Sequence, residues 1–153
     1  MKIGMITDSL GSLSFDDMLK ASAELGLETL EFACGNWSSA PHLNLTAMLS
    51  SPQMRAEFSA KVRDHGMTIA ALNCSGNPLH PGPQGALHHQ VTLDTIKLAS
   101  QMGIDRVVMM SGLPGGPGDA HKAIWAAERH RVSPKAAEQA TETAAQSGLR
   151  SSR

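Results

Sequence analysis

The chain has 153 residues, of which 41% are hydrophobic and 18% charged, with a formal net charge of −1 at pH 7 and a pI near 6.6. Its length and apolar content predict one globular domain with a substantial core. The near-neutral charge excludes a general attraction to nucleic acid or to an anionic membrane. No apolar run approaches the ~20 residues of a membrane span, and residues 1–4 lead into strand-like sequence rather than a signal peptide, so we expect a cytoplasmic protein.

Cysteine usage and the distribution of charge add two expectations. Cys34 and Cys74 lie far apart and outside any C-x-x-C pair, which favours free thiols over a zinc site or a disulfide framework. Residues 1–119 contain seven Lys or Arg and eleven Asp or Glu, a balance of −4, whereas residues 120–153 contain six and three, a balance of +3. This shift predicts a domain over 1–119 and an atypical Ala-rich tail over 120–153, weakly helical or disordered.

Short apolar runs alternate with helical patterns along the first part of the chain. Residues 2–6 and 28–32 are predicted strands, and between them Ser14 followed by Asp17 predicts a capped helix that ends at Gly26. A second helical pattern runs over residues 46–65, with Pro52 in a first turn. The helical spacing predicts buried positions in both: Phe15, Met18, Leu19, Ser22 and Leu25 in the first helix, and Met54, Phe58 and Val62 in the second.

The pattern then repeats. Residues 68–73 are a third predicted strand, residues 86–102 a third helix and residues 106–110 a fourth strand. The expected buried side of the third helix carries Leu87, Val91, Thr95, Leu98 and Met102. Four strands alternating with helices predict an α/β fold with a parallel sheet. Because the long, polar loops follow strands, we expect the site at the carboxyl ends of the strands, as in a (β/α)8 barrel or a doubly wound sheet.

The loop over residues 73–83, N-C-S-G-N-P-L-H-P-G-P, is the strongest candidate for that site. It follows a buried strand and offers Asn73 and Asn77 to bind a substrate and His80 as an acid or base, because imidazole titrates near neutral pH. The alternative is a rigid surface turn with a hydrated histidine. His88 and His89 are weaker candidates, because adjacent residues face different sides of a helix and cannot form a metal pair.

Three further residues fall at strand ends. Glu31 lies near the end of the second strand, where it could move a proton or simply anchor the neighbouring loop. Asp8 follows the first strand and could bind a substrate. Trp37 could stack on the ring of a ligand or act as a hydrophobic plug. These scattered acids follow no metal-binding spacing, so no metal ligand is assigned.

Four segments carry a resemblance to a known family: K-I-G-M, G-L-E-T-L-E-F, H-G-M-T-I-A-A-L and G-I-D-R-V-V-M-M-S-G. Over residues 1–119 the chain resembles the amino-terminal half of sugar phosphate isomerases and epimerases of the xylose-isomerase-like TIM-barrel superfamily. The resemblance implies metal-assisted proton transfer next to a sugar carbonyl, which interconverts aldose and ketose or epimers. It also implies a sugar or sugar phosphate as substrate and a divalent metal, Mn, Mg or Zn, as cofactor.

The length sets a limit on this resemblance. A (β/α)8 barrel takes ~250 residues, so residues 1–119 build about half, and the family's metal ligands come mostly from the other half. We therefore expect incomplete activity and no metal bound by this chain alone; truncation or a change of reading frame would explain the shift after Asp119. One alternative is a non-catalytic half-barrel that forms a homodimer through exposed strand edges. A weaker one is an endonuclease-type relative, which the lack of a basic face disfavours.

Overall fold

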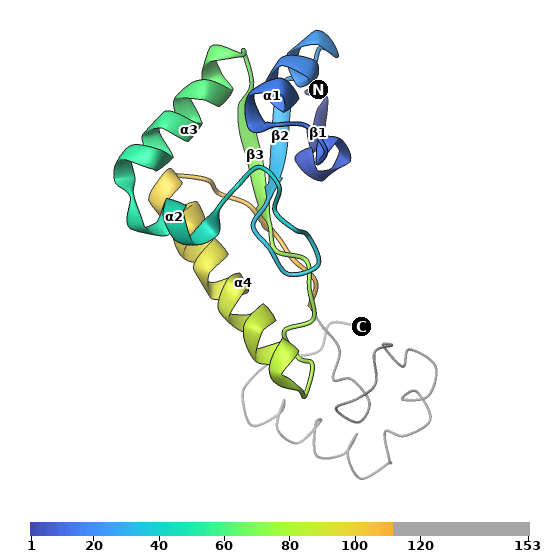
Figure 1. Cartoon of the computed structure of the whole chain (residues 1–153), viewed down its shortest axis with the longest axis vertical. Helices are drawn as coiled ribbons and strands as arrows, with labels where there is room; N and C mark the ends of the chain where they lie inside the picture. The colour runs from blue at the N-terminus through green and yellow to red at the C-terminus, as the bar shows by residue number, and fades with distance from the viewer. Residues whose placement is uncertain (112–153) are drawn as a thin grey trace, which may run out of the picture. The chain divides into compact units, whose positions relative to one another are not determined.

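A computed structural model of the chain describes residues 1–111, which form alternating strands and helices (Figure 1). Their order is β1 (Gly4–Ile6), the 3-10 helix η1 (Thr7–Leu10), α1 (Phe15–Glu24), β2 (Thr29–Ala33), α2 (Leu45–Ser50), α3 (Pro52–Asp64), β3 (Thr68–Asn73), α4 (Pro83–Met102) and β4 (Val107–Val108). The predicted tail, residues 120–153, lies outside the described residues. Within residues 1–111, no helix has the length and apolar character needed to cross a bilayer.

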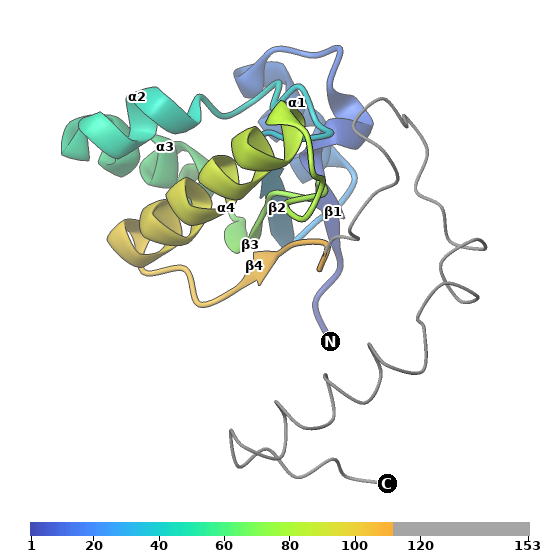
Figure 2. The same cartoon turned by 90° about the horizontal axis from the view of Figure 1, so that it is seen from below.

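The four strands form one parallel sheet, as predicted, and their order in it is β1-β2-β3-β4. The helices lie on one face of this sheet (Figure 2). Consecutive strands are therefore neighbours, each reached by a crossover on the same side, which is the right-handed arrangement that barrels repeat. Among the described strands, β1 and β4 are the two edges, and the second sheet face is not covered by any described helix.

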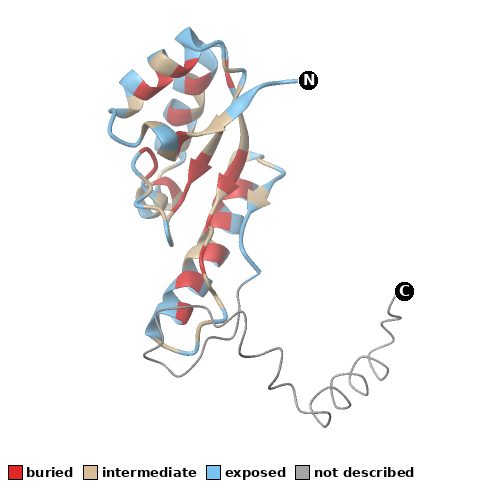
Figure 3. Ribbon diagram, turned by 90° about the vertical axis from the view of Figure 1, so that its right-hand side faces the viewer, coloured by how far each residue is buried: buried red, intermediate tan, exposed pale blue. Residues whose placement is uncertain are grey.

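The core lies between the sheet and the helices (Figure 3). Leu30, Phe32 and Leu72 point from β2 and β3 into this layer, and each is 0% exposed. The rings of Phe15 and Phe58 stack with centroids 4.7 Å apart, and Phe58 meets Phe32 edge-on at 4.9 Å. Burial of these large side chains supplies most of the driving force that holds the helices on this face.

A β-bulge in β3 decides which of its residues face the helices. Leu30 pairs with Ile69 but Glu31 pairs with Ala71, so Ala70 is an extra residue on β3. Because neighbouring strand residues point to opposite faces, one extra residue exchanges the faces of everything that follows. The bulge therefore turns Leu72 toward the core and Asn73 toward the uncovered face.

The structure corrects three details of the predicted helices. The single helix over 46–65 is two helices, because Ser51 is extended (φ −120°, ψ 104°), as residues before proline prefer to be. Helix α4 begins at Pro83 rather than Ala86, because proline is well suited to the first turn. Leu25, Met54 and Leu87 are exposed rather than buried. Leu25 follows the last turn of α1, and Met54 precedes the turns of α3 that meet the core. Leu87 is exposed because α4 is rotated about its axis relative to the predicted orientation.

The predicted cap of α1 is present and testable. Ser14 Oγ accepts the Asp17 backbone N–H at 3.1 Å and donates to Asp17 Oδ2 at 2.6 Å. We expect Ser14→Ala to lower the free energy of unfolding by about 1 kcal/mol, measured by urea denaturation. Ser12→Ala, an exposed serine two residues earlier, is the control and should cost no more than about 0.5 kcal/mol. Equal effects of the two changes would contradict a capping role.

Candidate functional site

The loops that follow β1, β2 and β3 meet at one edge of the sheet, because the strands are parallel. The residues predicted for the site lie in these strands or directly after them: Asp8, Glu31, Trp37, Asn73, Asn77 and His80. The carboxyl edge of a parallel sheet is where α/β folds bind ligands. The structure brings some of these residues into direct contact and separates others.

The side chains of Glu31 and Asn73 form a hydrogen bond at the uncovered face of the sheet. Asn73 Nδ2 donates to Glu31 Oε1 over 2.6 Å. Asn73 Oδ1 in turn accepts the Ser75 backbone N–H at 2.8 Å, which fixes the orientation of the amide. Glu31 and Asn73 are both partly buried. The fixed amide of Asn73 therefore holds one oxygen of the Glu31 carboxylate. This contact is compatible with both expected roles of Glu31, proton transfer and anchoring of the neighbouring loop.

The loop after β2 is tied to the loop after β3. Asn36 Nδ2 donates to the Cys74 carbonyl at 2.7 Å, and the Trp37 backbone N–H donates to the Ser75 carbonyl at 3.1 Å. The contact is close: a Cβ added to Gly76 would lie 2.8 Å from the Asn36 side chain, so a larger residue there would force the two loops apart. Trp37 is 61% exposed, so its expected role, stacking on a ligand or acting as a hydrophobic plug, stays a prediction.

The third loop is held against the start of α4. The Asn77 backbone N–H donates to His88 Nδ1 at 2.8 Å, and His80 Nδ1 accepts the Gly82 backbone N–H at 3.1 Å. A Cβ on Gly85 would collide with the His80 carbonyl oxygen, so glycine permits this approach. His88 is 3% exposed, whereas the sequence pattern pointed to Leu87 as the buried neighbour.

Four buried polar atoms near this edge have no hydrogen-bond partner in the part of the chain that the structure describes: Thr7 Oγ1, Asp8 Oδ1, Asn36 Oδ1 and His42 Nδ1. His42 is 7% exposed and its Nε2 lies 3.1 Å from the Leu13 carbonyl, which joins the loops after β1 and β2. Most buried polar atoms in proteins are paired, so unpaired ones need a specific explanation, of which a binding role is one. His42 was not among the site residues assigned from sequence, because periodicity does not reveal buried loop residues.

Both cysteines are free and buried beneath the site. Burial raises the pKa of the Cys34 thiol to about 12; the hydrogen bond with Thr95 opposes this rise, and the neighbouring Cys74 adds to it. Burial also raises the pKa of Cys74, against hydrogen bonds with Thr92 and Thr95. Neither thiol is suited to act as a nucleophile, because the reactive species is the thiolate.

We expect both thiols to resist alkylation in the folded protein. Iodoacetamide at pH 8 should label Cys34 and Cys74 quickly only after unfolding in urea, and mass spectrometry counts the adducts. Because the folded pKa of Cys34 lies above the unfolded value of 9.0, its contribution to stability is complete below pH 9 and is lost as the pH rises toward 12. Rapid labelling of the native chain at pH 8 would contradict the buried placement.

The predicted site residues fall into separate groups. Glu31 and Asn73 form one, and Asn77 and His80 form another at the start of α4. Among the described residues, no hydrogen bond or ion pair joins Glu31 to His80, and no three His, Cys, Asp or Glu side chains come close enough to hold a metal ion. The donor set of residues 1–111 therefore does not fit the divalent metal that the family resemblance implies.

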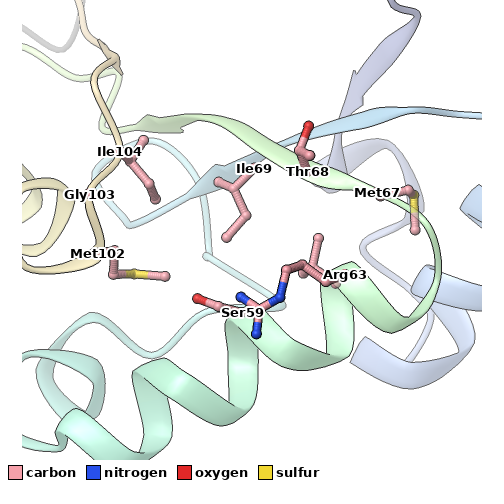
Figure 4. A pocket seen from close by; sticks show the side chains of 9 residues that line it. Ser59, Arg63, Met67, Thr68, Ile69, Met102, Gly103 and Ile104 are labelled. Atoms are coloured by element: carbon pink, nitrogen blue, oxygen red, sulfur yellow. The ribbon is translucent and has the colours of Figure 1, made fainter.

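A pocket lies at the other end of the sheet (Figure 4). Apolar side chains form much of its wall, with Arg63 and Ser59 from α3 beside them. Its lining residues come from α3, from the start of β3 and from the turn between α4 and β4: Ser59, Val62, Arg63, Met67, Thr68, Ile69, Met102, Gly103 and Ile104. This is the amino-terminal edge of the strands, where conserved packing in barrels serves stability, so the pocket is not part of the candidate site.

Sequential parallel strands, helices on one face and a polar carboxyl edge define a partial TIM barrel. The chain belongs to the xylose isomerase-like TIM barrel family, whose model matches residues 19–151. This family match extends beyond Asp119, so the domain boundary that we expected after Asp119 stays a prediction.

One curated relative is also similar to this chain. It is the uncharacterized protein YfiH of Bacillus subtilis (strain 168), which is 53% identical over 120 residues. The aligned part is 78% of this chain but 38% of that protein. The chain therefore spans well under half the length of the curated relative that it matches.

Proposed function

We propose that the carboxyl edge of the sheet is part of a site that interconverts isomers or epimers of a sugar or sugar phosphate by proton transfer. The observation that carries this proposal is the Glu31 carboxylate, held by Asn73 on the uncovered face of a xylose isomerase-like sheet. A carboxylate that is held at one oxygen and lies beside the loops of the carboxyl edge is suited to act as a general base.

In this proposal Glu31 removes the proton from the carbon next to the sugar carbonyl. The electron pair of the broken C–H bond forms the C=C bond of an enediol, and the carbonyl oxygen takes a proton, for which His80 is the proposed donor. Glu31 then returns the proton to the former carbonyl carbon, while the hydroxyl on the adjacent carbon gives its proton back to His80 and becomes the new C=O group, which yields the isomer. Asp8, Asn73 and Asn77 would bind hydroxyl groups, and Trp37 would stack on the sugar face.

A divalent metal, when bound, would polarise the carbonyl group of the substrate. Residues 1–111 bring together no group of three His, Cys, Asp or Glu side chains that could hold it, so no step above depends on it. The aligned part is 38% of the length of the curated relative, so in this proposal a complete site needs the other strands and loops of a full barrel. The free, buried thiols are compatible with the reducing cytoplasm.

The test is solvent exchange. The full chain is incubated in deuterium oxide with D-xylose or D-fructose 6-phosphate, with and without Mg²⁺ or Mn²⁺, and NMR measures deuterium at the carbon next to the carbonyl. We expect incorporation above that of heat-denatured chain with one of the two sugars. No incorporation under any of these conditions would contradict the proposal for this chain.

The second candidate is a non-catalytic half-barrel that pairs with another copy. The observation that favours it is the pair of edges, β1 and β4, which present unpaired backbone groups among the described strands. Pairing of β4 of one copy with β1 of the other would continue the parallel sheet. Sedimentation analysis would give a dimer in this case, whereas a monomer would contradict it.

A further inference from the structure

His88 has contacts that the proposed chemistry does not use. It lies in the second turn of α4, is 3% exposed, and receives the Asn77 backbone N–H at Nδ1 over 2.8 Å. Its carbonyl oxygen accepts Thr92 Oγ1 at 2.8 Å and lies 3.4 Å from Asn36 Nδ2. Its ring meets the Trp37 indole edge-on, with centroids 6.4 Å apart and planes at 88°. One buried residue therefore contacts two loops of the candidate site.

The bond to Asn77 fixes the chemical role of the imidazole. A backbone N–H can only donate, so Nδ1 must present its lone pair, and the ring proton is on Nε2. The acceptor in this bond lies at the δ position of the side chain. Asparagine also presents an acceptor at that position, whereas glutamine presents one a bond further out and leucine presents none.

We propose that His88 is the positioning residue that holds the loops carrying Trp37 and Asn77 in place over the candidate site. The Nδ1 atom of His88 accepts the Asn77 backbone N–H, and its carbonyl oxygen accepts a hydrogen bond from Asn36 Nδ2. The His88 ring packs edge-on against the Trp37 indole. Loops held in advance by buried contacts lose less conformational entropy when a ligand binds. The inference rests on the proposed function in one respect, namely that these loops bind the substrate.

The experiment uses the full chain without substrate, so its result does not depend on turnover. Amide hydrogen exchange by NMR measures the protection of the Asn77 N–H, and fluorescence measures the environment of Trp37 in a Trp125→Phe background. The variants are His88→Leu, His88→Gln and His88→Asn, with His89→Asn as the control on the exposed neighbouring position. Circular dichroism confirms that each variant is folded.

Loss of one buried hydrogen bond is worth about 1 kcal/mol, so Asn77 protection should fall about fivefold in His88→Leu and His88→Gln. His88→Asn should retain protection within about twofold, because it restores the acceptor. Trp37 emission should change in His88→Leu and stay unchanged in His89→Asn. Wild-type protection in His88→Leu, or equal protection in His88→Asn and His88→Gln, would overturn the inference; the second comparison stands even if the leucine variant does not fold.

Discussion

Glu31→Gln is expected to lower the rate of deuterium incorporation into the sugar by about 10²- to 10⁴-fold, the usual contribution of a positioned general base. Glutamine keeps a carbonyl oxygen that can accept Asn73 Nδ2, so the pair can retain its geometry while the proton acceptor is lost. The rate is measured by NMR in deuterium oxide, at the same protein concentration as the wild type. Circular dichroism checks that the fold is unchanged.

The control for this change is Glu24→Gln, which removes an exposed carboxylate from α1 and should leave the rate unchanged. If Glu31→Gln exchanges as fast as the wild type, Glu31 is not the base, and its bond to Asn73 serves to anchor the loop after β3.

Leu98→Ala is expected to lower the free energy of unfolding by about 2–5 kcal/mol, because Leu98 is 0% exposed in the core between α4 and the sheet. Leu87→Ala on the same helix should change it by no more than about 0.5 kcal/mol, because Leu87 is 61% exposed. Urea denaturation measures both, with unchanged slopes as evidence of a comparable unfolded state.

These two leucines were predicted to lie on one buried side of the helix, so the comparison tests the rotation of α4 directly. An equal cost for both variants would mean that the predicted side faces the sheet. His88 would then point elsewhere, and the contact with Asn77 would be lost. The stability measurement is therefore an independent check on the inference about His88.

The alternation of four strands with helices follows from local signals in the sequence. Apolar runs predicted the strands, Ser14 with Asp17 predicted the start of α1, and Pro52 predicted the first turn of a helix. Each of these signals acts through neighbours in the chain, by capping, backbone restriction or periodic burial. Because the carboxyl ends of parallel strands lie together, the placement of the polar loops at one edge was also predictable.

The contacts within the candidate site were decided only by the tertiary structure. The bulge at Ala70 sets the face of Asn73, and nothing in an apolar run marks where a partner strand will skip a residue. The rotation of α4 buries His88 and exposes Leu87, because the helix fits itself to the sheet and the loops below it rather than to its own most apolar side. The sequence by itself determined most of the elements, their order along the chain and the edge that carries the polar residues. Which side chains touch at that edge depends on register and rotation, and these are properties of packing between distant segments.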